Sequence, residues 1–531
     1  MLDLDRFYRT ARDEGRVSRR LFLGYAAALS SVPALAQQVS GRTLRKVSFS
    51  TDPFSAGVAS GDPTDTGVVL WTRLAPRPFE PGGGVPAENI EVEWELFADA
   101  ELTEPVRRGT AIATPQLGHS VHVELEGLQP SRWYWYRFRA GDAESRVGRT
   151  RTMPSALAVP KELKFAFASC QHYESGLYTA YEHMVRDGLD LVFHLGDYIY
   201  EGAAAEGQIR KHLGKELKSL DDYRIRHALY KSDPHLQAMH AECPWVVTWD
   251  DHEFDNNCAG DISEEKNVAP ADFLARRANA YQAYYEMMPL RRTALPRGAD
   301  MRLYRTVSFG RLAAFQVLDT RQYRTDQPND DNESPLNEAA LNPNNSLLGR
   351  RQAAWLQASL LESTATWNVL AQQVMMGLVG FRPKDKTELH YSMDQWPGAA
   401  HERGKLLEFL RDRRVPNPVV LTGDIHSNWV NDLRVDDRQP DTPIVAAEFV
   451  GTSLTSGGNG SQRFDGLEDC LASNPGVRFG NAERGYVRCT VTPDAWRSDY
   501  QVFEEIEKPG GAAVTRASFV VEEGARGVKT A

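Results

Sequence analysis

The sequence has few cysteines, no surplus of positive charge and no internal repeats. Its 531 residues include five cysteines, an odd number that leaves at least one thiol unpaired. The net charge of −11 argues against nonspecific nucleic-acid binding, which needs clustered lysine and arginine. Without a repeat of about 20 residues or a heptad array, neither a solenoid nor a coiled coil is expected. The chain also lacks a Gly-x-Ser-x-Gly motif and a P-loop, which disfavours a serine-triad hydrolase and a nucleotide motor.

The sequence does not decide whether one possible disulfide forms. An exported protein can form disulfides, and Cys470 and Cys489 lie close together late in the chain. Pairing and non-pairing of these two residues are both compatible with the sequence.

Residues 1–36 have the features of a cleavable export signal. Arg19 and Arg20 precede a short apolar run over 24–35, and the segment ends in an A-x-A site at Ala36. Paired arginines followed by Phe-Leu resemble a twin-arginine signal, which is an address read by a receptor. A surface helix or a membrane anchor is the alternative, but the run is too short to span a bilayer comfortably. We therefore expect export through the twin-arginine machinery to a periplasmic or extracellular location, with no membrane association after cleavage.

Length and composition predict a globular protein with at least two folded units. Hydrophobic residues make up 41% and charged residues 25%, enough for a sizeable core. From residue 45 to 155 we expect a small all-β sandwich of the immunoglobulin or fibronectin type. Strands are expected at 67–73, 90–96 and 121–125, because their side chains alternate or nearly alternate in character. A Leu-x-Pro turn before the Tyr-bearing segment at 133–136 is typical of the corners of such sandwiches.

From residue 160 to 531 the pattern changes to short apolar strands that alternate with helical stretches. The helical stretches include 176–186 and 271–288, and the alternation predicts a layered α/β domain. Residues 330–345 are rich in Asn, Asp and Pro and are expected to form a surface loop. For the last forty residues we expect a capping segment with an edge strand and a terminal helix.

Five apolar segments of this second region each end in polar side chains that can bind a ligand. Such groups are brought together in an α/β sheet, because ligands bind at the carboxyl ends of its strands. The segments, each with the polar run that follows it, are 164–168 with 169–172, 189–195 with 196–200, 245–249 with 250–253, 312–318 with 319–321, and 418–422 with 423–426.

The acidic side chains of these runs predict a metal cluster. Asp197, Asp424 and the pair Asp250 and Asp251 would repel one another if packed together, and each would favour its protonated form. A multivalent cation removes this conflict. His426, two residues after Asp424, lies on the same strand face and adds an imidazole.

Two further residue types narrow the choice of metal. Tyr200 can supply a phenolate, which suits a ferric ion, and Cys170 can supply a thiolate. Phenolate, thiolate and carboxylate together differ from the all-oxygen ligands of a calcium cage. The set therefore indicates iron beside harder divalent ions.

The motifs resemble those of the PhoD-like (alkaline phosphatase D) family of metallophosphatases, over nearly the whole chain after the signal. The Gly-Asp-x-x-Tyr form also occurs in purple acid phosphatases, and the set is similar to that of calcineurin-type phosphoesterases. The resemblance implies a catalytic domain over 160–531 built as a β-sandwich flanked by helices. The matching motifs are Gly61-Asp62-Pro63, Leu70-Trp71-Thr72-Arg73, Ser169-Cys170-Gln171, Gly196-Asp197-Tyr198-Ile199-Tyr200, Trp249-Asp250-Asp251-His252-Glu253 with Asp255-Asn256-Asn257, Asp319-Thr320-Arg321-Gln322-Tyr323-Arg324, and Gly423-Asp424-Ile425-His426.

The resemblance also implies an activity and a metal content. It implies hydrolysis of small phosphate monoesters and diesters by metal-activated hydroxide or oxide, with Fe³⁺ and two Ca²⁺; other divalent ions are also compatible. Asp250 and Asp251 both stay candidates, since Asp251 stands where the Gly-Asn-His-Glu form has asparagine. Carried over by position, the iron ligands are Cys170, Asp197, Tyr200 and Asp424, and the calcium ligands are Asp197, Asn257, Asp250 and His426.

Two residues are catalytic candidates. His252 could donate a proton to the leaving alkoxide, and Arg321 could clamp the phosphate with its planar fork. The alternatives are a hydrogen bond to a metal ligand for His252 and a structural ion pair for Arg321. His194 is expected to be a packed histidine, whereas for His172 an approach to the site and a solvated loop position both stay open.

Two other functions are compatible with the sequence. A dedicated phosphodiesterase or phospholipase-like hydrolase would use the same site, and comparing rates on a monoester and a diester would separate it from a phosphatase. An extracellular binding module stabilised by metal would fold and bind without turnover. The expected partners are phosphate esters and the export machinery, with no specific nucleic acid.

Overall fold

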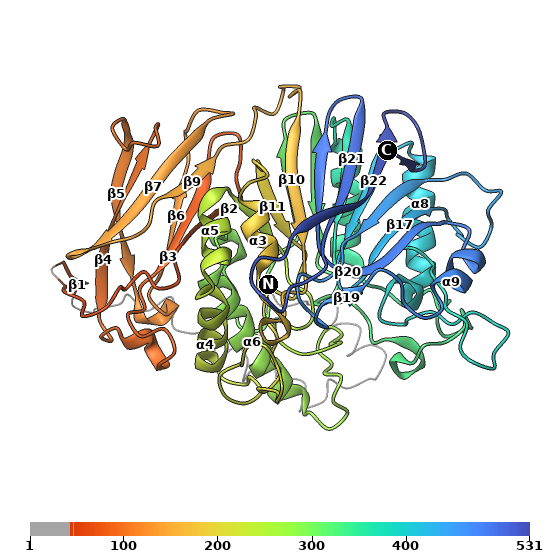
Figure 1. Ribbon diagram of the computed structural model, residues 1–531, viewed down its shortest axis with the longest axis horizontal. Helices are drawn as coiled ribbons and strands as arrows, with labels where there is room; N and C mark the ends of the chain where they lie inside the picture. Colours follow the sequence, from red (N-terminus) through yellow and green to blue (C-terminus); the bar gives the residue numbers. More distant parts are fainter. Residues whose placement is uncertain (1–42, 46) are drawn as a thin grey trace, which may run out of the picture.

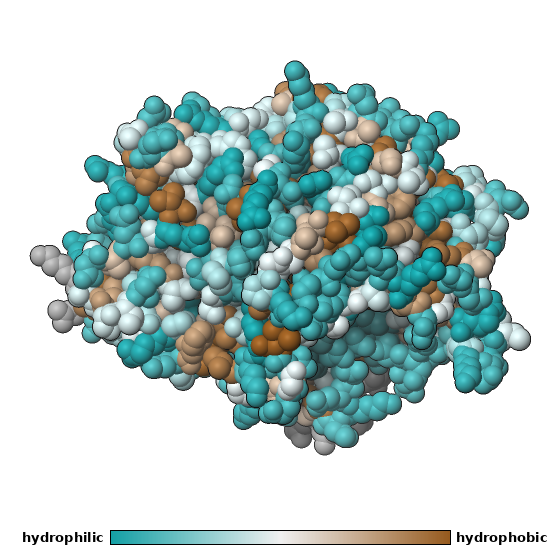
Figure 2. All heavy atoms as spheres, in the orientation of Figure 1, coloured by the Kyte–Doolittle hydropathy of each residue, from teal (hydrophilic) through white to brown (hydrophobic). Residues whose placement is uncertain are grey.

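The computed structural model describes residues 43–45 and 47–531, so the expected signal over 1–36 lies outside the described residues. Two mixed β-sheets pack face to face, and helices cover their outer faces (Figure 1). Exposed apolar side chains on the face shown in Figure 2 form small groups, and a hydrophilic recess opens beneath β19 and β20. In the described part of the chain, no helix combines the length and apolarity needed to cross a bilayer.

The first sheet contains strands from both ends of the chain. Its order is β6-β3-β2-β12-β11-β10-β20-β21-β22-β23, and the four central strands β2, β12, β11 and β10 run parallel. The bounds are β2 (Val58–Gly61), β3 (Val68–Arg73), β6 (Ser120–Leu125), β10 (Leu163–Ala168), β11 (Leu191–His194), β12 (Trp245–Val247), β20 (Val477–Val491), β21 (Ala495–Phe503), β22 (Ala513–Glu522) and β23 (Lys529–Thr530).

The second sheet has the order β13-β14-β15-β16-β18-β17 and then meets β20. The first part of β20 pairs with β17 and its last part pairs with β10 and β21, so this long strand belongs to both sheets. The other bounds are β13 (Arg305–Phe309), β14 (Ala313–Val317), β15 (Trp367–Ala371), β16 (Pro418–Thr422), β17 (Asn428–Leu433), β18 (Ala446–Val450) and β19 (Gly460–Ser461).

Alternation along the strands explains the layers. On β10, Phe165 and Phe167 point between the two sheets, whereas Ala166 and Ala168 face the helices. The expected helical stretches appear as α3 and α6. α3–α6 cover the first sheet and α7 and α8 the second. The helix bounds are α3 (Thr179–Met184), α4 (Leu220–Lys231), α5 (Pro234–Glu242), α6 (Pro270–Met287), α7 (Gly349–Glu362), α8 (Ala400–Asp412) and α9 (Leu467–Ser473).

The strands expected at 67–73, 90–96 and 121–125 are present as β3, β4 and β6. β4 belongs to a separate sheet that packs on β2, β3 and β6. Those three strands also extend the large first sheet, since Gly61 of β2 pairs with Trp245 of β12. An independent sandwich over 45–155 therefore stays a prediction. The bounds in the separate sheet are β1 (Thr43–Leu44), β4 (Asn89–Phe97), β5 (Pro105–Ala113), β7 (Trp133–Ala140), β8 (Ala143–Glu144) and β9 (Gly148–Arg151).

The C-terminal segment differs from the expectation. The expected edge strand is present as β23, which pairs with β22 at the end of the first sheet, but the expected terminal helix is replaced by β21 and β22, and in the described residues no helix follows α9. The segment forms strands because its buried side chains recur at every second residue. Phe519 and Val521 are buried and alternate with less buried neighbours.

The Cys470–Cys489 disulfide is not formed. All five cysteines are free and buried. Cys470 lies on α9 and Cys489 on β20, in two different core clusters. Each is held as a small apolar side chain.

The packing between the two sheets predicts a large effect of Phe165→Ala. The Phe165 ring meets Phe193, Phe315 and Trp496 edge to face, with centroids 5.4 to 5.5 Å apart. We expect the free energy of unfolding in urea to fall by about 3–5 kcal/mol. Phe79→Ala is the matched control, because Phe79 is 44% exposed and its removal should change stability by no more than about 0.5 kcal/mol. Similar effects of the two substitutions would contradict this packing.

A buried lysine makes stability depend on pH. Lys231 lies at the end of α4, 4.6 Å from the Trp71 ring and 3.4 Å from His240 Nε2. Burial lowers the pKa of Lys231 from 10.5 to about 7. Between these values the unfolded chain binds one proton more than the folded protein, so stability rises with pH.

Lys231→Met should remove this dependence. Between about pH 7 and about pH 9, the unfolding free energy of the wild type should rise by about 2 kcal/mol more than that of the variant. Urea unfolding at each pH measures the difference. Lys211→Met, at an exposed position, serves as the control for the loss of a lysine side chain.

Candidate metal centre

The five segments singled out in the sequence are strands, and their polar endings meet. β10, β11 and β12 are parallel neighbours in the first sheet, and β14 and β16 lie in the second, separated by β15. Because the carboxyl ends of parallel strands lie at the same edge, the side chains that follow them converge.

The chain turns sharply at the residues that carry the candidate ligands. Cys170, Asp197, Asn257, Asp424 and His426 all have positive φ, between 45° and 64°. A positive φ is uncommon for residues other than glycine, and such strain accumulates at functional sites. These turns aim the side chains away from the strand direction and toward one another.

Two glycines permit the close approach of neighbouring strand ends. A Cβ on Gly196 would lie 2.4 Å from the Asp250 Cβ, and the φ of Gly196 is 119°. A Cβ on Gly423 would lie 2.5 Å from the Ser169 Oγ. Each glycine directly precedes a candidate ligand, Asp197 or Asp424. The Gly-Asp motifs therefore carry a steric requirement as well as a carboxylate.

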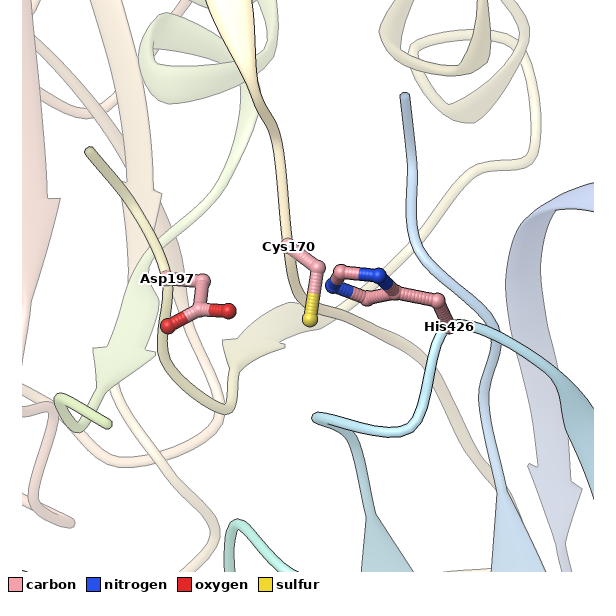
Figure 3. A group of neighbouring side chains, drawn as sticks. All are labelled: Cys170, Asp197 and His426. Carbon is pink, nitrogen blue, oxygen red and sulfur yellow. The ribbon is translucent and has the colours of Figure 1, made fainter. Parts of the chain in front are cut away.

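Three overlapping groups of side chains can each hold a metal ion. In every group, one ligand atom per residue lies within 4.8 Å of the others. Figure 3 shows the first group, in which the side chains approach one another from three separate segments. Asp197 and Asp251 each belong to two groups, so the groups form one continuous centre. The groups are Cys170 with Asp197 and His426, Asp197 with Asp251 and His252, and Asp250 with Asp251 and Asp424.

Tyr200 and Asn257 join the centre through hydrogen bonds. The Tyr200 hydroxyl donates to Asp197 Oδ2 at 3.0 Å and lies 3.2 Å from His426 Nε2. The Asn257 backbone N–H donates to Asp251 Oδ2 at 2.7 Å, while its side-chain amide donates to Asp331. Six of the predicted ligands therefore belong to the three groups and Tyr200 adjoins them, whereas Asn257 reaches the centre through its backbone and directs its side chain to Asp331.

Burial and mutual repulsion disfavour the charged form of most carboxylates of the centre. Burial, followed by neighbouring carboxylates, raises the pKa of Asp197 and of Asp250 well above the ordinary value, although His252 and Arg321 oppose the shift. Burial raises the pKa of Asp424 to about 6, against the effect of Arg321. For Asp251, Arg321 and His252 outweigh the effect of burial and lower the pKa.

Buried oxygen atoms without partners fit a cation. Asp197 Oδ1 and Asp250 Oδ2 are buried and have no hydrogen-bond partner, and Asp251 Oδ1 has only the Arg321 guanidinium at 3.5 Å. An unsatisfied buried carboxylate oxygen is costly unless a cation or a donor meets it. The residues present therefore suit bound metal ions.

The Arg321 guanidinium forms ion pairs with four carboxylates. Its side chain is fully buried and ion-pairs with Asp250, with Asp251 at 3.5 Å, with Asp394 at 2.7 Å and with Asp424 at 3.2 Å. Its planar fork leaves no exposed face for a phosphate in this structure. The geometry favours the structural ion pair over the phosphate clamp.

Sequence reasoning missed several residues of the centre. Asp394 and Gln395 contact Arg321 and Asp424 from an irregular segment, and no pattern in the sequence marks them. Ser456, in the loop between β18 and β19, donates to the Tyr200 hydroxyl at 2.6 Å. Glu253 is the last residue of the motif over 249–253, and this position was the feature of the sequence that could have identified it. It accepts the backbone N–H groups of Asp197, Tyr198 and Asp250 and so fixes two strand ends together.

The histidines separate into different environments. His252 Nδ1 lies 2.8 Å from Glu201 Oε2. Burial acts to lower the pKa of His252, but Glu201, Asp251 and Asp197 hold it well above 6.5. His194 is fully buried outside the three groups, as expected of a packed residue. His172 packs against Tyr200 with ring centroids 4.5 Å apart, so it approaches the centre.

Comparison with known proteins agrees with the resemblance inferred from the motifs. The family model for the PhoD-like phosphatase matches residues 165–500, and that for the PhoD-like phosphatase N-terminal domain matches residues 38–154. Alkaline phosphatase D of Bacillus subtilis (strain 168) is 49% identical over 520 residues, which cover 96% of this chain and 88% of that protein. A solved structure of PhoD has a TM-score of 0.88 and 50% identity, covering 91% of this chain and 93% of that one. The chain therefore belongs to the family of PhoD-like phosphatases.

Proposed function

We propose that the protein is an exported, metal-dependent phosphatase that hydrolyses small phosphate monoesters and diesters. The observation that carries the proposal is the continuous centre of three ligand groups at the strand ends, with buried carboxylate oxygens that lack partners. Membership in a phosphatase family supports turnover over a binding module. Export by the twin-arginine route, from a signal over 1–36, and a separate sandwich over 45–155 are parts of the same proposal.

The ligand types support two kinds of ion. Thiolate, carboxylate and phenolate from Cys170, Asp197 and Tyr200 suit Fe³⁺, and the oxygen-rich side of the centre around Asp250 and Asp251 suits Ca²⁺. The side chain of Asp424 stands with that second group, and His426 stands beside Cys170. Bound metal ions would neutralise the ester oxygens and supply a nucleophile at ordinary pH.

The chain's own residues position the reacting groups. We assign His252 as the proton donor to the leaving oxygen rather than as a metal ligand, because Glu201 Oε2, 2.8 Å from its Nδ1, orients the ring. Arg321 acts by holding the carboxylates of Asp250 and Asp424 at fixed positions. Glu253 keeps the backbone of two strand ends in register.

Cys170→Ala should remove iron and activity together. Loss of a ligand from the centre is expected to lower turnover of p-nitrophenyl phosphate and bis-p-nitrophenyl phosphate by at least about 100-fold. Elemental analysis of the purified protein should find about one iron per chain in the wild type and much less in the variant. Asp424→Ala should lower turnover to a similar degree and weaken its dependence on added calcium.

Cys489→Ala is the matched control, since Cys489 is equally buried but lies on β20 away from the centre. It should keep its metal and its activity. A folded, metal-replete wild type inert to both esters would sink the proposal, and activity on the diester alone would favour a dedicated phosphodiesterase.

His252→Gln should impair the enzyme most on esters with poor leaving groups. An alkoxide needs a proton as it departs, whereas p-nitrophenolate does not. We expect turnover of glycerol phosphate to fall by about 10²–10⁴-fold and turnover of p-nitrophenyl phosphate to fall much less. Glu201→Gln should give the same pattern with smaller losses. Equal losses on both esters would exclude His252 as the proton donor.

A further inference from the structure

A fourth cluster of ligand-capable side chains lies beside the centre. His172, Glu174 and His212 each offer one ligand atom, and these atoms lie within 4.8 Å of one another. His172 and Glu174 lie in the turn after β10, whereas His212 belongs to the segment between β11 and α4. The residues are separate from the eight predicted ligands of the phosphatase centre, and their geometry stands independently of the proposed function.

The spacing of two of these residues matches a tetrahedral metal ion. His212 Nδ1 lies 3.4 Å from Glu174 Oε2. Two atoms at this separation subtend an angle of about 108° at a zinc ion that is about 2.1 Å from each. His212 Nδ1 is buried and has no hydrogen-bond partner, so it is a polar atom that needs a ligand.

The remaining polar atoms of the cluster orient these ligands. His212 Nε2 lies 2.9 Å from the Tyr230 hydroxyl, and His172 Nδ1 lies 2.8 Å from Ser175 Oγ. Histidines that bind a metal almost always donate their second ring N–H to a carboxylate, a backbone carbonyl or water, and a hydroxyl oxygen can accept it as well. Glu174 is fixed by the backbone N–H of His212, which donates to its Oε1 at 2.9 Å, and by that of Ala205.

The charges around the cluster favour a transition metal over calcium. The cluster offers two imidazole nitrogens and one carboxylate oxygen. The positive charges of Arg210 and Arg226 act on these histidines, and they would repel a cation bound by charge alone. Zinc forms directional bonds to neutral imidazole, whereas calcium prefers several carboxylate and carbonyl oxygens.

We propose that His172, Glu174 and His212 bind a zinc ion or a similar transition-metal ion, separate from the phosphatase centre. The ion would fasten the segment over 201–219 to the turn after β10. His172 packs against Tyr200, so this fastening lies directly beside a predicted iron ligand.

Co²⁺ is the probe for this site, because it substitutes for zinc and absorbs visible light in four-coordinate sites. The full-length protein with its resident metals is kept in calcium and titrated with Co²⁺. We expect uptake of one Co²⁺ per chain with a visible band, and in His212→Gln a loss of that band or binding weakened by more than about tenfold. Iron and calcium contents should be unchanged. His183→Gln is the matched control, since His183 Nε2 contacts the Gly511 carbonyl outside every ligand group, and it should bind Co²⁺ as the wild type does.

Proteolysis gives a second readout. Lys211 and Lys215 are exposed in the fastened segment, so zinc should slow trypsin cleavage there in the wild type and in His183→Gln but not in His212→Gln. Equal Co²⁺ uptake by the wild type and folded His212→Gln would overturn the proposal. If His212→Gln does not fold, His172→Gln takes its place, and undiminished uptake by that variant would overturn the proposal equally.

Discussion

The burial of several carboxylates in one place is the constraint on which the rest of the structure depends. Asp197, Asp250, Asp251 and Asp424 lie together at the strand ends, where each would be costly to keep ionised without a partner. Arg321 contacts three of them and also Asp394, so its single positive charge is shared among four acids. The remaining negative charge can be removed by protonation or balanced by cations taken up from solution. A buried ion pair of this kind fixes positions more than it adds stability.

Much of the centre could be predicted because its residues follow buried strands directly. An apolar run that stops just before Asp197 or Asp424 indicates both the strand and the residue near which it ends. Asp394 and Gln395 could not be found in this way, because they reach the centre from an irregular segment whose path is set by tertiary contacts. The role of Arg321 was also undecided in the sequence, since only its burial separates an ion pair from a phosphate clamp.

The fold was predictable to a similar extent and for a related reason. Alternation located β3, β4 and β6, and the change of period near residue 160 located the layered region. Strand pairing is nonlocal, so the sequence did not reveal that β2 joins β12 or that β20 serves both sheets. The expected terminal helix was wrong because Phe519 and Val521 of β22 are buried with a period of two, which indicates a strand.

The pairing of β2 with β12 has a consequence for how the molecule can be divided. β2 lies along the side of β12 that faces away from β11 and, with β3 and β6, completes that end of the sheet. A chain cut near residue 155 would uncover backbone N–H and C=O groups along β12, which is a ready template for joining another copy. The family models divide the chain at that point, yet β2, β3 and β6 of the leading region cover one edge of the first sheet. The part that carries the candidate metal ligands therefore relies on the leading region to cover that edge of its sheet.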